Sequence, residues 1–387
     1  MTQENTMYMM KRSVKIVCLT VLGIFLFSLG YAQDERYVRV SIIRNENSVS
    51  VKVAGFYQIK NAETGEILRR GRGLRGDLTY SSSGFSIAKT IFKAHKIFIK
   101  SDYPEEITVN GRKFSGNILF TQKSNSTFAG INYIHLEDYV KGVLYHEVSH
   151  YWPLEVLKAQ AVVCRSFALY QMQANKNREF DVTNDIYSQV YGGRTSERYR
   201  TSLAVDRTKG IVLTYNGKIL PAYFHSTCGG RTEDASVLWN TAIGPLKGVE
   251  CGFCKESPHF KWVKILSPEE LSAALKKGNR LVPETISVFE VNGYDESGRV
   301  KKIRIAGGGK TLELSANTFR NLIGPNNIRS TNFKVVVINK DIVFSGIGWG
   351  HGVGMCQWGA YFMSKEGYSF EQILKYYYPG VEIHETL

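Results

Sequence analysis

The chain has 387 residues, 43% of them hydrophobic and 22% charged, which is typical of a globular protein with one large or two modest domains. Its formal net charge of +14 and isoelectric point near 9.3 favour anionic partners such as nucleic acid, a membrane surface or cell-wall glycan. The sequence has no long run of Lys and Arg and no nucleic-acid-binding motif, so we do not expect nucleic acid as a partner.

Residues 1–32 are predicted to be a signal peptide. Three cations, Lys11, Arg12 and Lys15, precede an apolar run that is too short for a permanent membrane span. Small residues lead up to the predicted cleavage site after Ala32, which implies an exported protein in the periplasm or cell envelope. Removing three cations and one anion leaves a net charge of about +12 (46 minus 34).

Residues 33–132 are predicted to form a β-rich N-terminal region. Apolar and polar residues alternate in several short runs, as in strands with one buried face. Asn110-Gly111 predicts a turn within this region. The predicted strands are residues 38–43, 48–53, 97–100 and 118–120.

Residues 133–387 are predicted to form a mixed region, which places the whole chain in the α+β class. A helix is expected from Pro153 onward, because proline suits the first helical position and the apolar residues then recur at three- and four-residue steps. Lys158 and Arg165 lie seven residues apart and share a second face of this helix, with Glu147 shortly before it. The alternative interpretation is a buried helix whose two cations are solvated. If the helix serves the site, we expect the two cations to bind substrate oxygens or other carboxylates.

The rest of the chain predicts a hairpin, an inserted subdomain and a Gly-rich segment. The Asn216-Gly217 turn predicts a hairpin of strands 210–215 and 218–224. A small subdomain is inserted at about residues 267–340, and Ser267 is the expected N-cap of its first helix. The Gly-rich segment, residues 345–360, is followed by one helix that runs to about Lys375. The other expected elements are helices 198–208, 268–277 and 316–323 and strands 286–292, 300–306 and 333–338.

Residues 146–150 form the string H-E-x-x-H, the signature of a zinc-binding helix in metalloproteases. Such a site requires both histidines on one face of a continuous helix. Pro153 follows three residues after His150 and disfavours helical backbone just before it. We therefore do not expect metalloprotease chemistry.

Five cysteines remain after the predicted cleavage, so they cannot all form disulfides with one another. Cys251 and Cys254 have the spacing of a metal-binding pair, with His259 five residues further on and Cys228 as a candidate fourth ligand. A structural zinc on these four residues and a disulfide between Cys228 and Cys251 or Cys254 are both open. Neither would be catalytic, and we expect the remaining thiols to be buried and inert.

Ordered blocks of the sequence resemble the stage II sporulation protein D family, which includes the amidase-enhancer proteins. Several blocks in the family's order form a more specific signal than any single motif. The blocks are residues 139–148, 152–168, 189–193, 224–233, 351–360 and 376–380, and together they span about residues 133–385.

The resemblance implies a lytic transglycosylase that acts on peptidoglycan glycan strands stripped of their stem peptides, and it places the catalytic acid at Glu147. An ordinary glycosidase needs two carboxylates. A lytic transglycosylase needs one, because the sugar's own 6-hydroxyl attacks the anomeric carbon and leaves a 1,6-anhydro-N-acetylmuramic end. Glu147 must then be buried enough to keep a proton near neutral pH. Glu155, soon after Pro153, is expected to be a solvated residue of the first helical turn.

The amidase-enhancer branch of the family implies a different function, a non-catalytic wall-binding activator of an N-acetylmuramoyl-L-alanine amidase. In both cases the expected partners are peptidoglycan glycan strands, and catalysis needs no cofactor. Polar residues in the matching blocks are the candidate substrate-binding residues. They are Lys158, Gln160, Arg165, Gln189, Tyr191, His225, Ser226, His351 and Gln357.

Overall fold

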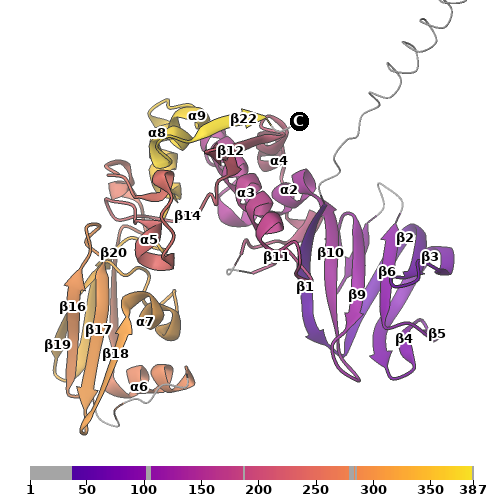
Figure 1. Ribbon diagram of the computed structural model, residues 1–387, viewed down its shortest axis with the longest axis horizontal. Coiled ribbons are helices and arrows are strands. Elements are labelled where there is room, and N and C mark those ends of the chain that lie inside the picture. The colour runs from indigo at the N-terminus through magenta and orange to yellow at the C-terminus, as the bar shows by residue number, and fades with distance from the viewer. Residues whose placement is uncertain (1–36, 102–105, 186–187, 279–282, 284–285, 386–387) are drawn as a thin grey trace, which may run out of the picture. The chain divides into compact units, whose positions relative to one another are not determined.

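The computed structural model describes residues 37–385 apart from 102–105, 186–187, 279–282 and 284–285 (Figure 1). The predicted signal peptide, residues 1–32, lies outside the described residues. Within them, no helix combines the length and the apolar character that crossing a membrane requires. From Val38 onward the chain forms a single unit.

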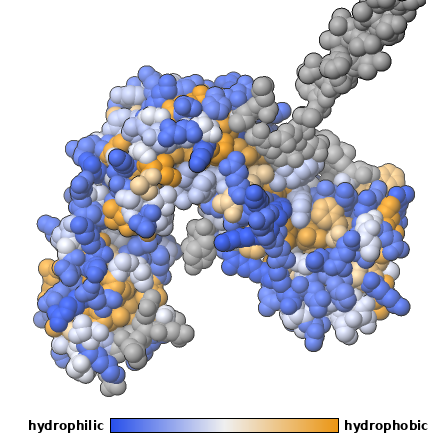
Figure 2. Space-filling view, in the orientation of Figure 1, coloured by the Kyte–Doolittle hydropathy of each residue, from blue (hydrophilic) through white to orange (hydrophobic). Residues whose placement is uncertain are grey.

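The N-terminal region is one sheet, as its alternating pattern predicts, with the strand order β11-β1-β10-β9-β6-β2-β3-β4-β5. The neighbours from β10 to β5 in this order pair antiparallel, whereas β1 pairs with β11 in parallel. The hairpin of β7 and β8 adds to β2 and turns at Asn110-Gly111. Alternate residues of β2 are buried, and polar residues cover much of the visible face of this region (Figure 2). The strands are β1 (Tyr37–Glu46), β2 (Ser48–Asn61), β3 (Ile67–Ser81), β4 (Gly84–Ile87), β5 (Thr90–Phe92), β6 (Lys96–Ser101), β7 (Ile107–Val109), β8 (Arg112–Phe114), β9 (Asn117–Gln122), β10 (Phe128–His135) and β11 (Val182–Thr183).

A helical region follows β10 without a break. Helix α3, with Pro153 as its N-cap, packs against α2, α4, α8 and α9 and is buried over most of its length. The predicted single helix up to Lys375 is wrong, because the chain forms two helices separated by a turn at Gly367, whose φ is +92°. The helices are α2 (Leu136–Glu147), α3 (Leu154–Ala174), α4 (Tyr199–Asp206), α5 (Ala235–Trp239), α8 (Gln357–Lys365) and α9 (Phe370–Tyr377), and the short 3-10 helices are η1 (Gly193–Ser196), η2 (Gly244–Leu246) and η3 (Phe253–Glu256).

The predicted hairpin at Asn216-Gly217 is present but shorter than expected. Strand β12 (Ile211–Tyr215) pairs with β13 (Lys218–Ile219) on one side and with β22 (Glu382–Glu385) on the other. Residues 224–225 form a separate strand, β14 (Phe224–His225), which pairs in parallel with β21 (Met355–Cys356). This pairing brings together two of the sequence blocks that carry the family resemblance.

The close approach of these two blocks depends on Gly354. Its φ is +71°, and a Cβ atom there would lie 1.9 Å from the carbonyl oxygen of Tyr223. No residue with a side chain fits this position without moving the backbone. The amide of Met355 donates to that same carbonyl, at 3.1 Å.

The described part of the inserted subdomain contains two three-stranded antiparallel sheets and two helices, drawn in salmon, orange and brown in Figure 1. Its first and last strands pair with each other, so the chain leaves and re-enters the helical region at neighbouring points. Ser267 caps α6 in a capping box with Glu270, as predicted. The elements are β15 (Lys261–Leu266), α6 (Pro268–Lys277), β16 (Val288–Tyr294), β17 (Val300–Gly307), β18 (Lys310–Ser315), α7 (Ala316–Ile323), β19 (Phe333–Ile338) and β20 (Asp341–Ile347).

Candidate active site

Glu147 is the last residue of α2. The next residue, Val148, is extended with φ −141°, and its amide donates to the Leu144 carbonyl. The apolar face of α2, including Tyr139, Val143 and Leu144, is buried in the core. Glu147 is therefore held at a fixed helix end, where the partial negative charge of the helix C-terminus disfavours a carboxylate.

Burial raises the pKa of Glu147 from 4.5 to about 7, and a hydrogen bond from the Val190 amide to Oε1, at 3.2 Å, opposes part of this rise. No Lys or Arg forms an ion pair with Glu147 within the described part of the chain. A carboxyl group with such a pKa is protonated for much of the time at neutral pH, which is the property of a general acid.

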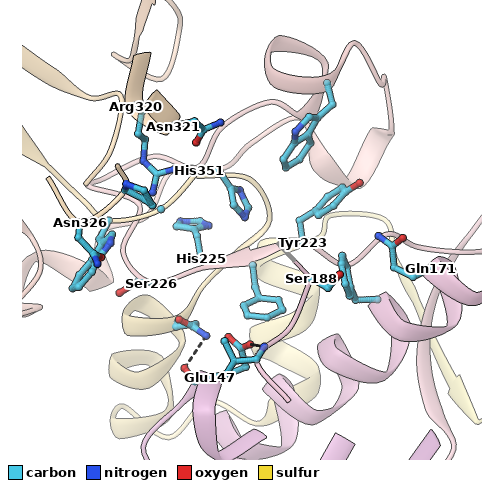
Figure 3. A pocket seen from close by; sticks show the side chains of 18 residues that line it. Glu147, Gln171, Ser188, Tyr223, His225, Ser226, Arg320, Asn321, Asn326 and His351 are labelled. Carbon is cyan, nitrogen blue, oxygen red and sulfur yellow. Dashed lines mark hydrogen bonds between the residues drawn. The ribbon is translucent and has the colours of Figure 1, made fainter. Parts of the chain in front are cut away.

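Glu147 lines a cavity of about 600 Å³ (Figure 3). The wall is built by side chains from helix α3, from the loop near Val190, from β14, from the Gly-rich segment and from the inserted subdomain. Of the described lining residues, Glu147 is the only Asp or Glu. The polar and charged lining residues are Glu147, Gln171, Ser188, Tyr223, His225, Ser226, Trp239, Arg320, Asn321, Asn326, Trp349, His351 and Gln357.

His225 and His351 lie between Glu147 and Arg320 in Figure 3, with their rings 5.6 Å apart. Burial lowers the pKa of His225 well below its usual value, and it lowers that of His351 to about 3. Both rings are therefore neutral at pH 7. Nδ1 of His225 donates to the Val353 carbonyl at 3.1 Å, because a carbonyl only accepts. Nε2 of His225 is thus an acceptor, and it is buried with no partner in the described residues.

The hydrogen bonds of His351 imply the opposite tautomer. Its Nδ1 accepts from the Val353 amide at 3.1 Å, so its other ring nitrogen carries the proton. His225 therefore has an unused acceptor, while His351 supports the backbone of the Gly-rich segment. Of the two, His225 is the one with hydrogen-bonding capacity left for a ligand.

Aromatic rings form a second part of the cavity wall. The rings of Tyr223 and Trp239 lie 4.4 Å apart and 37° from parallel, and Trp239 also contacts His351 at 5.3 Å. Trp349 contributes a further indole. Flat apolar faces with polar edges suit the alternating C–H and O–H groups of a sugar ring.

Arg320, on α7, brings a cation into the cavity. Its side chain is nearly buried, and its Nε donates to the carbonyl of Arg329 at 3.2 Å. Burial lowers its pKa to about 10, so it stays charged at neutral pH. No carboxylate forms an ion pair with it in the described residues. The terminal nitrogens of the guanidinium are thus available for an anionic group.

Lys158 and Arg165 do not line the cavity, so their predicted role in substrate binding is wrong. Lys158 pairs with Glu155 at 2.6 Å and lies over the ring of Phe370. Arg165 is fully buried and forms two hydrogen bonds with the carboxylate of Glu137, at 2.8 and 2.7 Å. A cation on a buried helix needs such a partner, because an unpaired charge in the core is costly.

Gln160, Gln189 and Tyr191 also lie outside the cavity wall, behind Glu147. Nε2 of Gln357, which does line the cavity, donates to the Glu147 carbonyl at 3.1 Å and to Oε1 of Gln160 at 3.3 Å. Gln189 accepts from the hydroxyl of Tyr139 at 3.0 Å, and Tyr191 donates to Asn132 at 2.9 Å.

The ring of Tyr191 also fixes the position of α2. It packs so tightly on Gly142 that a Cβ atom there would lie 2.6 Å from it. Gln189 and Tyr191 therefore contact the helix that carries Glu147, and Gln160 contacts Gln357.

The H-E-x-x-H string does not form a zinc-binding helix. Helix α2 ends at Glu147, between the two histidines. The ring of His146 contacts Ser196 Oγ at 2.6 Å, while His150 packs against Tyr145 and Tyr151. The two histidines therefore have separate surroundings, as the position of Pro153 leads us to expect.

Three of the four predicted metal ligands lie together, but the prediction of His259 as the fourth is wrong. Cys228, Cys251 and Cys254 are joined by Cys356, and these four thiols are the only group of potential metal ligands in the described residues. The ring of His259 instead packs against Trp349, 4.7 Å away. The five described cysteines are buried and carry free thiols in this structure.

Several lining residues were not predicted from the sequence. Tyr223 stands two positions before His225, and Trp349 stands two positions before His351. Their aromatic side chains could have indicated a sugar-binding wall. Arg320 lies in the inserted subdomain, outside every block that carries the resemblance, and no linear pattern connects it with Glu147.

The chain is similar in sequence to known families and proteins. The family described as stage II sporulation protein matches residues 124–215, and a domain of unknown function (DUF8618) matches residues 247–354. An uncharacterized protein of Brachyspira hyodysenteriae is 38% identical over 277 residues, which cover 71% of this chain and 73% of that protein.

Two relatives from Bacillus subtilis carry informative names. The amidase enhancer is 28% identical over 291 residues, 63% of this chain but only 40% of that protein. Stage II sporulation protein D is 35% identical over 268 residues, covering 65% of this chain and 75% of that protein. The chain therefore belongs to the stage II sporulation protein D family.

Proposed function

We propose that this protein is a lytic transglycosylase that cleaves peptidoglycan glycan strands with Glu147 as its single acid and base. The observation that carries the proposal is that one carboxyl group, with a pKa of about 7, stands alone among the described residues that line the cavity. A hydrolase with two carboxylates would need a second acidic residue in the wall.

The reaction conserves protons and uses no cofactor. Glu147 donates its proton to the glycosidic oxygen as the bond from that oxygen to C1 of the muramic sugar breaks. The 6-hydroxyl oxygen of the same sugar forms a new bond to C1, and its proton passes to Glu147. The carboxyl group is restored, no water is consumed, and the product is a 1,6-anhydro end.

The cavity wall supports a glycan substrate without its stem peptides. Tyr223, Trp239 and Trp349 offer ring faces for sugar packing, and Nε2 of His225 offers an acceptor for a hydroxyl or an N-acetyl N–H. Arg320 offers a cation for the lactyl carboxylate of the muramic sugar. That carboxylate is free only after the peptide has been removed, because an attached peptide converts it into an amide.

The deciding experiment is a digest of purified, peptide-stripped glycan strands by residues 33–387, read by mass spectrometry. We expect anhydro-ended disaccharides from the wild type and a rate at least about 100-fold lower from Glu147→Gln, since loss of a general acid costs a factor of that order. Glu155→Gln is the matched control, because Glu155 pairs with Lys158 outside the cavity and its loss should leave cleavage unchanged. Equal cleavage by wild type and Glu147→Gln would contradict the proposal.

The similarity to an amidase enhancer favours a second candidate, a wall-binding activator without its own lytic activity. The same digest separates the two functions. Retained glycan binding without any cleaved product, together with stimulation of a cell-wall amidase by wild type and Glu147→Gln alike, would support the activator. Family membership supports a cell-wall role in either case.

Both candidate functions place the protein outside the cytoplasm, where the wall is built. The basic and apolar residues at the N-terminus, with the predicted cleavage site after Ala32, support export. N-terminal sequencing of the mature protein from its host would test this directly, and a first residue other than Gln33 would correct the boundary.

A further inference from the structure

We propose that Cys228, Cys251, Cys254 and Cys356 bind a zinc ion that holds the wall of the cavity together. The four sulfur atoms come from three segments that are far apart in the sequence, and all lie within 4.8 Å of one another. Each of these cysteines is at most 1% exposed. Four buried thiolate ligands complete the coordination of a structural zinc ion. They leave no open coordination position for a substrate.

The spacing of the sulfur atoms fits a metal better than a disulfide. In a tetrahedral site with Zn–S bonds of about 2.3 Å, the sulfurs lie about 3.8 Å apart. Sγ of Cys228 and Sγ of Cys254 are 3.4 Å apart. A disulfide would need about 2.05 Å and would join only two of the four sulfurs.

Hydrogen-bond donors surround the cluster in the way that thiolates require. The amides of Gly359 and Cys228 approach Sγ of Cys356, each at 3.3 Å, and the amide of Gly230 approaches Sγ of Cys228 at 3.4 Å. The hydroxyl of Tyr377 lies 3.2 Å from Sγ of Cys251. Donors directed at the ligands compensate the negative charge of a four-thiolate site, as outer residues do in known metal centres.

The ligands are next to residues that line the cavity. Gln357 follows Cys356 directly, and Ser226 stands two residues before Cys228. The remaining two ligands come from the segment around η3. A zinc ion would thus join this segment to the two chain segments that carry His225 and Gln357. The role of the zinc ion in supporting a substrate cavity rests on the proposed function. The metal site itself does not.

The first test measures metal and thiols in residues 33–387, purified without added zinc or chelator. We expect one zinc per chain by elemental analysis, and five reactive thiols after denaturation with a chelator. Replacement of zinc by cobalt should give the absorption spectrum of four thiolates around tetrahedral Co²⁺. A chain with no metal and fewer than five thiols would overturn the proposal in favour of a disulfide, and bound iron would overturn the choice of zinc.

Variants identify the ligands. Cys356→Ser should lower zinc retention during dialysis against chelator by at least 10-fold, whereas Cys164→Ala, which changes a buried thiol outside the cluster, should retain one zinc. His259→Ala should also retain one zinc. Loss of zinc in His259→Ala with retention in Cys356→Ser would contradict the four-cysteine site. Because metal content is measured without a glycan substrate, a zinc-loaded but inactive chain would contradict only the lytic function.

Discussion

The carboxyl group of Glu147 illustrates a conflict between chemistry and stability in a single residue. Folding surrounds it with protein and raises its pKa from 4.5 to about 7, with burial as the main cause. Below pH 4.5 the group is protonated in both the folded and unfolded states and adds no penalty. As the pH rises from 4.5 to 7, the unfolded chain gains a solvated carboxylate first, so the folded state becomes less stable.

We therefore predict that Glu147→Gln stabilises the protein in a pH-dependent way. At pH 8 its free energy of unfolding should exceed that of the wild type by up to about 3 kcal/mol, the linkage value of the full pKa shift. At pH 4.5 the two should be nearly equal. Urea unfolding at both pH values measures the difference. An equal effect of Glu155→Gln, or a Glu147→Gln variant that is less stable at pH 8, would contradict the burial argument.

At this scale, the sequence identifies residues whose chemistry is local to a motif. Glu147, His225 and His351 are recognisable because they stand within linear blocks. The role of Arg165 was not recognisable, because it depends on Glu137, 28 residues away, which neutralises it in the core. A cation in a motif is compatible with substrate binding and with internal pairing, and only its neighbours in space decide between them.

Among the elements, α7 has the most consequential position. It lies in the inserted subdomain, whose core is separate from those of the rest of the chain, yet it supplies Arg320 and Asn321 to the cavity. The sequence analysis places a helix at residues 316–323, and the structure confirms these bounds for α7. Its contribution to the cavity was not predictable, because it depends on how the insert folds back.

We predict that Arg320→Ala weakens the binding of peptide-stripped glycan by about 10- to 100-fold, because a hydrogen bond to a charged group contributes about 1.5–3 kcal/mol. Strands that retain their peptides lack the free carboxylate and should lose much less affinity. Titration calorimetry with both substrates measures the difference. Arg304→Ala is the control, because Arg304 pairs with Glu290 on the exposed side of β17. An equal loss for the two kinds of strand would exclude carboxylate recognition.

Strand β14 marks a limit of prediction at the scale of elements. The Asn216-Gly217 turn correctly indicates a hairpin, and local pattern alone extends its second strand to residue 224. The strand instead ends at Ile219, and residues 224–225 pair with β21, some 130 residues later in the chain. Pairing between distant segments leaves little trace in a short sequence window. The assembly of the cavity was therefore not predictable, whereas the α+β class was.

At the scale of the whole molecule, the excess of positive charge has a physical consequence. The chain carries 49 Lys and Arg against 35 Asp and Glu. Some of the cations are exposed on strand β3, among them Arg70, Arg72 and Arg75. Such a surface attracts an anionic polymer over distances of about 10 Å at moderate salt.

We predict that binding to intact, anionic cell wall weakens with salt. Raising the sodium chloride concentration from 50 to 500 mM should lower the bound fraction in a co-sedimentation assay at least several-fold, because screening shortens the range of surface charges. Glu147→Gln should have the same salt dependence, since its position is within the cavity. Salt-independent binding would mean that the surface charge has no part in wall association.

The hydrogen bond between Gln357 and the carbonyl of Glu147 joins residues 210 positions apart. During synthesis, the strands up to β10 and the helix that carries Glu147 emerge long before the segment that contains His351 and Gln357. Until that segment arrives, water reaches the carboxyl group and keeps its pKa near the ordinary value. A chain that lacked this segment would thus leave the carboxyl group of Glu147 in contact with water. The last residues of the chain complete the burial that raises the pKa of this group to about 7.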